Sequence, residues 1–180
     1  VAAPCFPSSG RIVIGNYMLV NGTPLHRTNI ALDPKCPVRI SEVDRLFREQ
    51  SKYQVTAIRM GEMMDGVHAL AQKIRACHQA GSRILTFDCV SQEDLDLIAD
   101  ACIESGEKII AVDPGAFTAS LARKIIKPRM DRRQNHILVV VGSVNSSTTA
   151  QLEEFWLTQE ANNVMVRTRE LLEGEERREK

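Results

Sequence analysis

A loop in the last quarter of the sequence has residue types that suit phosphate binding. The apolar run at residues 137–141 leads into Gly142 and Ser143, and a polar stretch with Asn145 and Thr148 precedes an expected helix. A glycine lets backbone amides approach a ligand closely, and the positive end of a helix dipole favours an anion. The loop matches neither GxxxxGK[ST] nor GxGxxG, so an ordinary strand-to-helix turn remains the alternative.

Thr148 has a simpler interpretation than ligand contact. Thr148 and Gln151 have the spacing of a capping box, in which each side chain bonds the other residue's backbone amide at a helix start. We favour that interpretation for Thr148, although it stays a candidate for nucleotide contact. The capping box does not account for Gly142, Ser143 and Asn145, which remain the stronger nucleotide-binding candidates.

Two aspartates follow other apolar runs. Asp88 ends the run at residues 83–88, and Asp113 ends the run at 108–113, two residues before Gly115. Ligands of open parallel sheets gather at the carboxyl ends of the strands, so Asp88, Asp113 and Gly115 are candidate substrate-binding residues. The structural alternatives are a tight turn for Asp113 and Gly115 and a helix-dipole partner for Asp88.

The elements that must position these residues follow from apolar periodicity. Apolar residues recur at helical spacing after Ser41, over 66–80, after Ser91 and before Pro128, and short apolar runs separate them. Ser91 and Asp94 have the spacing of a capping box at the start of the third of these helices, and residues 1–9, with two prolines, are expected to be an irregular lead-in. This alternation predicts right-handed βαβ units, and so an α/β fold with a Rossmann-like, mostly parallel sheet and flanking helices. The pair Asn21-Gly22 predicts a β-hairpin near the N-terminus. The expected strands are residues 53–58, 83–88, 108–113, 136–142 and 163–167, and the last expected helix is 149–159.

Composition excludes several classes of protein. Lys plus Arg and Asp plus Glu number 23 each, so the net charge gives no electrostatic footprint for nucleic acid or for an anionic membrane. No apolar run reaches the roughly 18 residues that span a bilayer. The five cysteines form no CxxC pair and the four histidines share no ligand spacing, so no metal site is expected. Each histidine, His26 among them, is expected to be a surface or packing residue. Such scattered cysteines are typical of reduced thiols in a cytoplasmic protein.

A domain boundary is expected in the segment 127–135. This segment contains a proline, several basic residues and little apolar sequence, which is typical of a linker. It would separate a first domain at residues 1–126 from a second at residues 136–180.

Several segments in this order resemble the four-carbon acid sugar kinase family. They include PCFPSSGR at residues 4–11, NGTPL at 21–25 and DPKCPV at 33–38. The similarity continues through GSRILTFDCVSQEDLDLIADA, GEKIIAVDPGAFTASLARKI and ILVVVGSVNSSTTAQLE. The resemblance implies the second half of a sugar-acid-binding domain followed by the beginning of a nucleotide-binding domain. It implies ATP-dependent phosphorylation of a small four-carbon sugar acid such as threonate, erythronate or 3-oxo-tetronate, with ATP and Mg²⁺ as cofactors.

The resemblance also assigns roles residue by residue. Gly142 and Ser143 match the Gly-Ser of the family's nucleotide loop, and Asn145 stands where the family has a second serine. Arg11 matches a Gly-Arg of the substrate domain and would pair with a carboxylate. The Asp113-Pro114-Gly115 run departs from the family's Gly-Ser-Gly-Gly, which leaves the identity of the sugar acid open.

Two further expectations concern the chain as a whole. The resemblance implies a fragment of a kinase, inactive alone, because the family's acidic opening motif and later Gly-rich loops are absent from this sequence. Apolar residues of a partial second domain would favour a homodimer. The alternative function is a non-catalytic, Rossmann-like module that binds a ligand or a partner.

Overall fold

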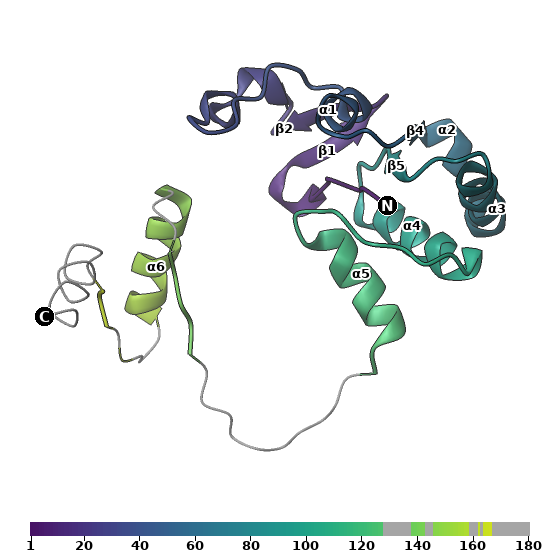
Figure 1. Ribbon diagram of the computed structural model, residues 1–180. Coiled ribbons are helices and arrows are strands. Elements are labelled where there is room, and N and C mark those ends of the chain that lie inside the picture. Colours follow the sequence, from purple (N-terminus) through teal and green to yellow (C-terminus); the bar gives the residue numbers. More distant parts are fainter. Residues whose placement is uncertain (128–137, 143–145, 159–161, 163, 167–180) are drawn as a thin grey trace, which may run out of the picture. The chain divides into compact units, whose positions relative to one another are not determined.

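A computed structural model of the chain contains two compact units, Val1–Met130 and Asp131–Lys180 (Figure 1). Beyond residue 127, the predicted linker 127–135 lies outside the described residues, so the domain limits 1–126 and 136–180 stay predictions. The structure describes residues 1–127, 138–142, 146–158, 162 and 164–166.

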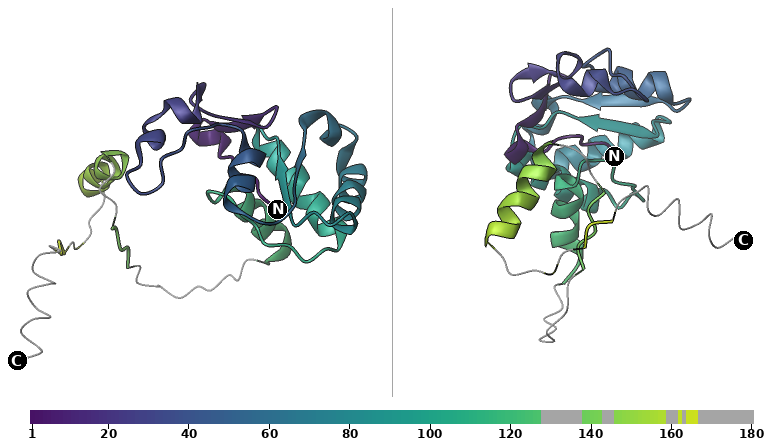
Figure 2. Two further views of the ribbon diagram at one scale, coloured as in Figure 1. Left: turned by 45° about the horizontal axis from the view of Figure 1, so that its top comes forward. Right: turned by 90° about the vertical axis from the view of Figure 1, so that its left-hand side faces the viewer.

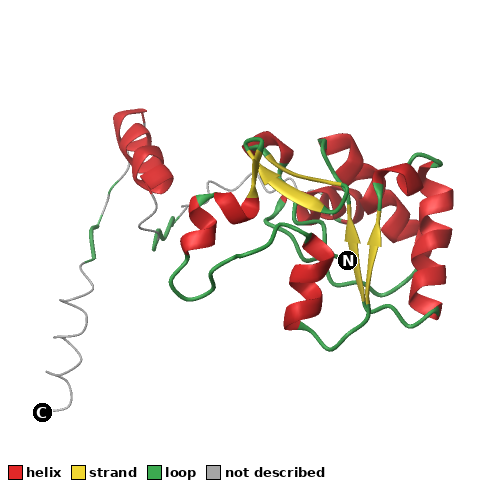
Figure 3. Cartoon of the chain, turned by 90° about the horizontal axis from the view of Figure 1, so that it is seen from above, coloured by secondary structure: helices red, strands yellow, loops and turns green. Residues whose placement is uncertain are grey.

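Two parallel strands form the centre of the first unit. β4 (Val55–Ile58) pairs with β5 (Ile84–Phe87), and α3 (Gly66–Gln79) makes the crossover between them. Helices lie on either side of this strand pair (Figure 3). The apolar face of α3 buries Leu70 and Ile74, as its 3.6-residue periodicity predicts. The predictions of these two strands and of this helix are confirmed.

Two more segments run parallel beside β5. Ala2 bridges Thr86 of β5 on one side and Val112 on the other. The Ala2 amide donates to a β5 carbonyl at 2.7 Å, and the Ala3 amide donates to the Val112 carbonyl at 3.1 Å. The predicted strand at 108–113 is therefore reduced to a single bridge at Val112. The N-terminal residues, expected to be an irregular lead-in, lie inside the sheet instead.

A three-stranded antiparallel sheet follows the N-terminal segment. Its strands are β1 (Arg11–Ile14), β2 (Tyr17–Val20) and β3 (Thr23–Pro24), in the order β1-β2-β3. Asn21 and Gly22 join β2 to β3 with φ angles of 50° and 75°, which confirms the predicted hairpin turn.

A second tight turn, which sequence reasoning missed, joins β1 to β2. Gly15 and Asn16 have φ angles of 59° and 68°, the left-handed values of a two-residue hairpin loop. The hairpin is fixed to the parallel sheet, because Val13 and Cys89 exchange two backbone hydrogen bonds of 2.9 and 2.8 Å. The two sheets are therefore neighbours in the first unit (Figure 2).

The remaining helices of the described first unit surround these sheets. α4 and α5 pack side by side, and α1 contacts β4 and β5. The largest side chains of the core come from both β-strands and helices, and include Ile58, Leu70, Ile74, Phe87, Leu95, Ile98 and Phe117. The helices are α1 (Val43–Gln50), α2 (Met60–Met63), α4 (Gln92–Ser105) and α5 (Ala116–Ile125), with 3-10 turns at Pro7–Ser9, Leu25–Arg27 and Asn29–Leu32.

The second unit contains α6 (Ser146–Thr158), which begins three residues before the predicted helix 149–159. The strand predictions at 136–142 and 163–167 fail for the described residues of those segments, since no ladder partner pairs with them there. Together the described elements form a mixed α/β fold with a small parallel sheet, an antiparallel hairpin sheet and helices.

Candidate functional site

The carboxyl ends of the parallel strands define the candidate site. β4 ends just before Arg59, β5 ends just before Asp88, and the segment with Val112 ends at Asp113. Because these segments are parallel, their carboxyl ends meet at one edge of the sheet, where α/β proteins bind their ligands. Asp88 and Asp113 therefore belong to the same edge.

Asp88 is buried and accepts hydrogen bonds from three backbone amides. Its side chain is 2% exposed. The Gly15 and Met60 amides donate to Oδ2 at 2.9 and 3.0 Å, and the Asn16 amide donates to Oδ1 at 2.7 Å. A buried carboxylate is costly unless hydrogen bonds satisfy it, and here it also satisfies amides of a turn and of a helix start. Asp88 therefore ties the hairpin and α2 to the end of β5.

Asn16 continues this connection to α1. The Asp44 amide donates to Asn16 Oδ1 at 3.0 Å, and the Val43 amide donates to the Asn16 carbonyl at 2.8 Å. The Asn16 side-chain amide also donates to the Asp44 carboxylate. Asn16 therefore satisfies amides of the first turn of α1, which would otherwise lack partners. The hairpin turn is held on both sides, by Asp88 and by α1.

Arg11 is the first residue of β1 and follows a constrained glycine. Gly10 has a φ of 73°, and its carbonyl accepts from the Asn21 amide at 2.8 Å. The Arg11 side chain is half-buried and forms no hydrogen bond or ion pair within the part of the chain that the structure describes. A guanidinium with free donors suits bidentate binding of a carboxylate.

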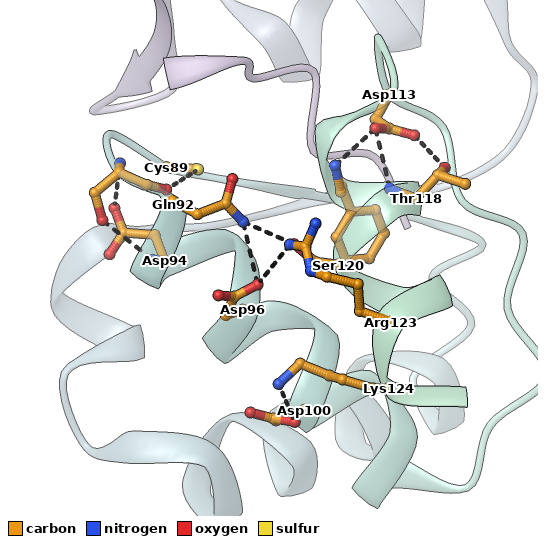
Figure 4. Close-up of polar contacts among 12 residues, drawn as sticks. Cys89, Gln92, Asp94, Asp96, Asp100, Asp113, Thr118, Ser120, Arg123 and Lys124 are labelled. Atoms are coloured by element: carbon orange, nitrogen blue, oxygen red, sulfur yellow. Dashed lines mark hydrogen bonds and ion pairs between the residues drawn. The ribbon is translucent and has the colours of Figure 1, made fainter. Parts of the chain in front are cut away.

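Asp113 caps the start of α5 (Figure 4). Its Oδ2 accepts from the amides of Gly115, Phe117 and Thr118 at 2.7, 2.8 and 3.1 Å, and its Oδ1 accepts from the Thr118 hydroxyl. Gly115 adopts a φ of 126°, a conformation that favours glycine. The positive end of this helix already has a carboxylate on its free amides, so a ligand anion would compete with Asp113 there.

A polar cluster between α4 and α5, which sequence reasoning missed, fixes the position of α5 (Figure 4). The Ser120 hydroxyl accepts from Gln92 at 2.8 Å and from Arg123 at 2.9 Å, and Gln92 also donates to Asp96 at 3.1 Å. A hydrogen bond with Ser120 holds the pKa of Asp96 below its usual value. The residues come from two helices, so no local spacing in the sequence indicates the cluster.

The start of α4 has the predicted capping box. The Asp94 amide donates to the Ser91 hydroxyl at 3.2 Å, and the Ser91 amide donates back to Asp94 Oδ2 at 3.0 Å. This confirms the helix start inferred from Ser91 and Asp94, and it fixes the chain where it leaves β5.

His26 is oriented by a buried serine. Ser41 is fully buried, and its hydroxyl accepts from the His26 backbone amide at 3.1 Å. The same hydroxyl lies 2.7 Å from His26 Nδ1, and the Tyr17 ring packs edge-on against the imidazole. His26 was expected to be a surface or packing residue, and these contacts hold its ring in one orientation beside the hairpin.

The five cysteines are free thiols, four of them buried. A hydrogen bond with Cys5 and burial both raise the pKa of Cys89, and burial raises the pKa of Cys102 to about 12. Raised values keep a thiol protonated and unreactive. The buried cysteines therefore serve as small apolar core residues.

The predicted nucleotide-binding residues fall in the second unit. Gly142 is exposed, and a Cβ added there would meet no other heavy atom within 4 Å. Ser143 and Asn145 lie outside the described residues. Thr148 lies inside the first turn of α6, because the helix begins at Ser146; the prediction that Thr148 is the N-cap of a box with Gln151 is therefore wrong. A ligand contact of Thr148 stays a prediction.

Metal and membrane binding can be examined for the described residues. No three His, Cys, Asp or Glu side chains in that part of the chain gather as they would around a metal ion. None of its helices has the length and apolar content that crossing a bilayer requires.

Solved structures share this mixed α/β fold. One is a domain of unknown function from Bordetella bronchiseptica, solved with bound citrate as a domain-swapped dimer. The similarity spans 68% of this chain and 29% of the Bordetella chain. Its TM-score is 0.54 and its identity is 28%. The similarity to a Haemophilus influenzae protein spans 87% of this chain and 38% of that protein's chain, with a TM-score of 0.59. At 19% identity, the second similarity shows the fold alone.

The family follows from sequence comparison. The model of the sugar-binding N-terminal domain matches residues 1–121, and the chain belongs to that domain family of the four-carbon acid sugar kinases. A D-erythronate kinase of Heliobacterium modesticaldum is 40% identical over 153 residues, which are 85% of this chain and 35% of the relative. A D-threonate kinase of Salmonella typhimurium is 30% identical with the same coverage. A 3-oxo-tetronate kinase of Cupriavidus necator is 27% identical over 88% of this chain and 38% of the relative.

These alignments also show how much of each relative the chain covers. It spans little more than a third of the length of these curated relatives. The predicted family is therefore confirmed, and the activity of a whole kinase becomes a proposal for this chain.

Proposed function

We propose that this chain contributes the sugar-acid-binding domain of an ATP-dependent kinase that phosphorylates a four-carbon sugar acid. The observation that carries the proposal is the 40% identity to a D-erythronate kinase over 85% of the chain, together with the sugar-binding domain match. The relatives are named for three related acids, and D-erythronate is our first choice of substrate.

Arg11 is the proposed partner of the substrate carboxylate. Its guanidinium is free of ion pairs within the described residues, and it extends from the hairpin that Asp88 holds at the strand ends. A charge-assisted, bidentate pair at this position would select an acid over a neutral polyol. The bound citrate of the Bordetella neighbour, itself a carboxylate ligand, is consistent with this chemistry.

Asp88, Asp113 and Gly115 are proposed to shape the same site. Asp88 would act by positioning, since its buried oxygens accept three backbone amides. Asp113 Oδ1 accepts one hydroxyl already and has a lone pair left for a substrate hydroxyl. Gly115 leaves the start of α5 without a side chain, so a ligand can approach the backbone there.

ATP is proposed to contact Gly142, Ser143, Asn145 and Thr148. The open space at Gly142 and the start of α6 at Ser146 are consistent with a phosphate near these backbone amides. ATP would supply the phosphoryl group, and Mg²⁺ would accompany it, as is usual in phosphoryl transfer. The described residues offer no acidic cluster for Mg²⁺, so we assign it no protein ligand.

Three broader features belong to the same proposal. The parallel strands are part of a Rossmann-like sheet, which the flanking bridges of Ala2 support. The protein works in the cytoplasm, consistent with five free cysteines. It assembles as a homodimer.

Titration calorimetry of the 180-residue chain tests the proposed substrate class. We expect D-erythronate to bind and erythritol, which has the same carbon chain without the carboxylate, to bind at least about tenfold more weakly. Threonate and 3-oxo-tetronate would rank the sugar acids. Binding of neither compound, or equal binding of both, would contradict the proposal and favour a module for another ligand.

The Arg11→Ala variant tests the assigned carboxylate partner. Loss of a hydrogen-bonded charge typically costs about 1.5–3 kcal/mol, so the affinity for the acid should fall by about 10- to 100-fold. Arg27→Ala, on another exposed arginine of the hairpin region, is the matched control and should bind normally. An unchanged affinity of Arg11→Ala would remove Arg11 from the site and leave the substrate class untouched.

A further inference from the structure

His26 has one ring nitrogen that no residue within the described ranges contacts. Its Nδ1 lies 2.7 Å from the Ser41 hydroxyl, whereas its Nε2 forms no hydrogen bond or ion pair within those ranges. The imidazole is held by Ser41 and by the edge-on ring of Tyr17, with ring centroids 6.5 Å apart. The side chain is half-buried, so it has little freedom left to lose when a ligand binds to Nε2.

The hydrogen of the buried Ser41 hydroxyl decides which ring nitrogen is a donor. Ser41 is fully buried, and its oxygen already accepts from the His26 backbone amide at 3.1 Å. The hydroxyl hydrogen needs an acceptor of its own, and among the described residues His26 Nδ1 is the one in hydrogen-bond range. In the neutral ring Nδ1 therefore accepts and Nε2 carries the hydrogen, and in the protonated ring Nε2 carries one as well. Nε2 is a fixed hydrogen-bond donor in either state.

This donor lies close to the strand-end edge of the parallel sheet. Tyr17, whose ring contacts the imidazole, directly follows the turn Gly15–Asn16. Both amides of that turn donate to Asp88 at the end of β5. His26 itself follows β3 of the antiparallel sheet that begins at Arg11, the proposed carboxylate partner. The donor and the free guanidinium therefore belong to the same small sheet.

We propose that His26 donates a hydrogen bond from Nε2 to a hydroxyl oxygen of the bound sugar acid and so selects the configuration of that hydroxyl. This inference rests on the function proposed above. Arg11 would recognise the carboxylate, which every sugar acid has, so it cannot distinguish one acid from another. D-Erythronate and D-threonate differ in the configuration of a single hydroxyl-bearing carbon. A fixed donor discriminates between them, because the acid with the wrong configuration leaves the donor without its hydrogen bond.

Titration calorimetry of the unmodified chain, of His26→Asn and of the control His68→Asn with both acids tests the proposal. Asparagine keeps an oxygen that can accept from Ser41 but has no donor at the position of Nε2, so the fold should remain and the ligand contact should be lost. We expect the affinity for D-erythronate to fall about 3- to 10-fold, and the affinity for D-threonate to fall less. His68 lies on α3, and its variant should leave both affinities unchanged.

The outcomes separate this inference from the proposed function. If the unmodified chain binds neither acid, the proposed function fails and the inference fails with it. If the unmodified chain binds D-erythronate and His26→Asn binds it equally well, the inference alone is overturned. A variant that weakens both acids by the same factor also overturns it, because the ring then contributes packing and no selection.

Nitrogen-15 NMR of the unmodified chain gives a second measurement that needs no change in affinity. In the neutral ring we expect the chemical shift of an acceptor at His26 Nδ1 and that of a protonated nitrogen at Nε2. The Nε2 hydrogen should shift and exchange more slowly with water when D-erythronate saturates the chain. Ser41→Ala should leave a mixture of tautomers and reduce the affinity difference between the acids. A hydrogen on Nδ1 of the neutral ring, or an Nε2 hydrogen that the acid leaves unchanged, would overturn the proposal.

Discussion

Asp88 gives the sharpest test of how the hairpin is held against the sheet. Its buried carboxylate accepts amides from Gly15, Asn16 and Met60 at 2.7 to 3.0 Å. Hydrogen bonds to a charged group contribute about 1.5–3 kcal/mol each, so a simple sum gives about 4.5–9 kcal/mol. The bonds share one acceptor and are not additive, and burial of the carboxylate opposes them. We therefore expect Asp88→Ala to lower the free energy of unfolding by about 3–5 kcal/mol.

Asp88→Asn separates charge from shape. It keeps one acceptor oxygen and places an amide group against the remaining donors, so we expect a loss of about 2 kcal/mol. Urea denaturation followed by far-UV circular dichroism measures both variants, because the single tryptophan, Trp156, belongs to the second unit. Asp65→Asn, at an exposed aspartate without a side-chain cap bond, should change stability by less than about 0.5 kcal/mol. If Asp88→Ala is as stable as that control, the connection we derive from the three amides does not hold.

Three further predictions use other parts of the first unit. Gly10→Ala should cost about 1–2 kcal/mol in urea denaturation, because alanine is strained at a φ of +73° and the added Cβ, 1.9 Å from Oδ1 of Asn21, would displace that side chain. Iodoacetamide should modify the native chain at Cys36 alone, as counted by mass spectrometry, since the other four cysteines are buried. A hydrogen bond from the Arg59 backbone amide lowers the pKa of Glu62 below its ordinary 4.5. The ionised Glu62 carboxylate therefore stabilises the folded chain above pH 4.5, and this contribution is lost as pH falls through the lowered pKa. Glu62→Gln should therefore show a smaller loss of stability on acidification than the unmodified chain, measured by denaturation at several pH values.

The sequence predicts the parts of the fold that depend on local chemistry. The Asn21-Gly22 turn and the Ser91–Asp94 capping box are correct because a few adjacent residues determine them. The α3 helix is correct because its apolar spacing extends over several turns.

Segments whose structure depends on distant partners are predicted less well. Residues 1–3 lie inside the sheet because β5 and the Val112 segment each offer backbone groups to Ala2, more than 80 positions away in sequence. The predicted strand at 108–113 has the apolar content of a buried strand, yet only its inner side finds a ladder partner. The role of Asp88 in holding the hairpin could not be predicted from the sequence either, because its amide donors come from a turn and a helix start far from it in sequence.

The two aspartates at the strand ends have the same role in the candidate site. Asp88 and Asp113 each direct their charge to backbone amides, at a hairpin turn and at the start of α5. Such carboxylates fix the loops at the edge of the sheet and leave little negative charge free to repel an acid. Arg11 then stands as the uncompensated charge of the hairpin within the described residues. Because Asp88 sets the position of that hairpin, Asp88→Asn should weaken sugar-acid binding along with stability, whereas Arg11→Ala should weaken binding alone. A variant of Asp88 that unfolds more easily but binds the acid with full affinity would place the carboxylate site elsewhere on the sheet edge.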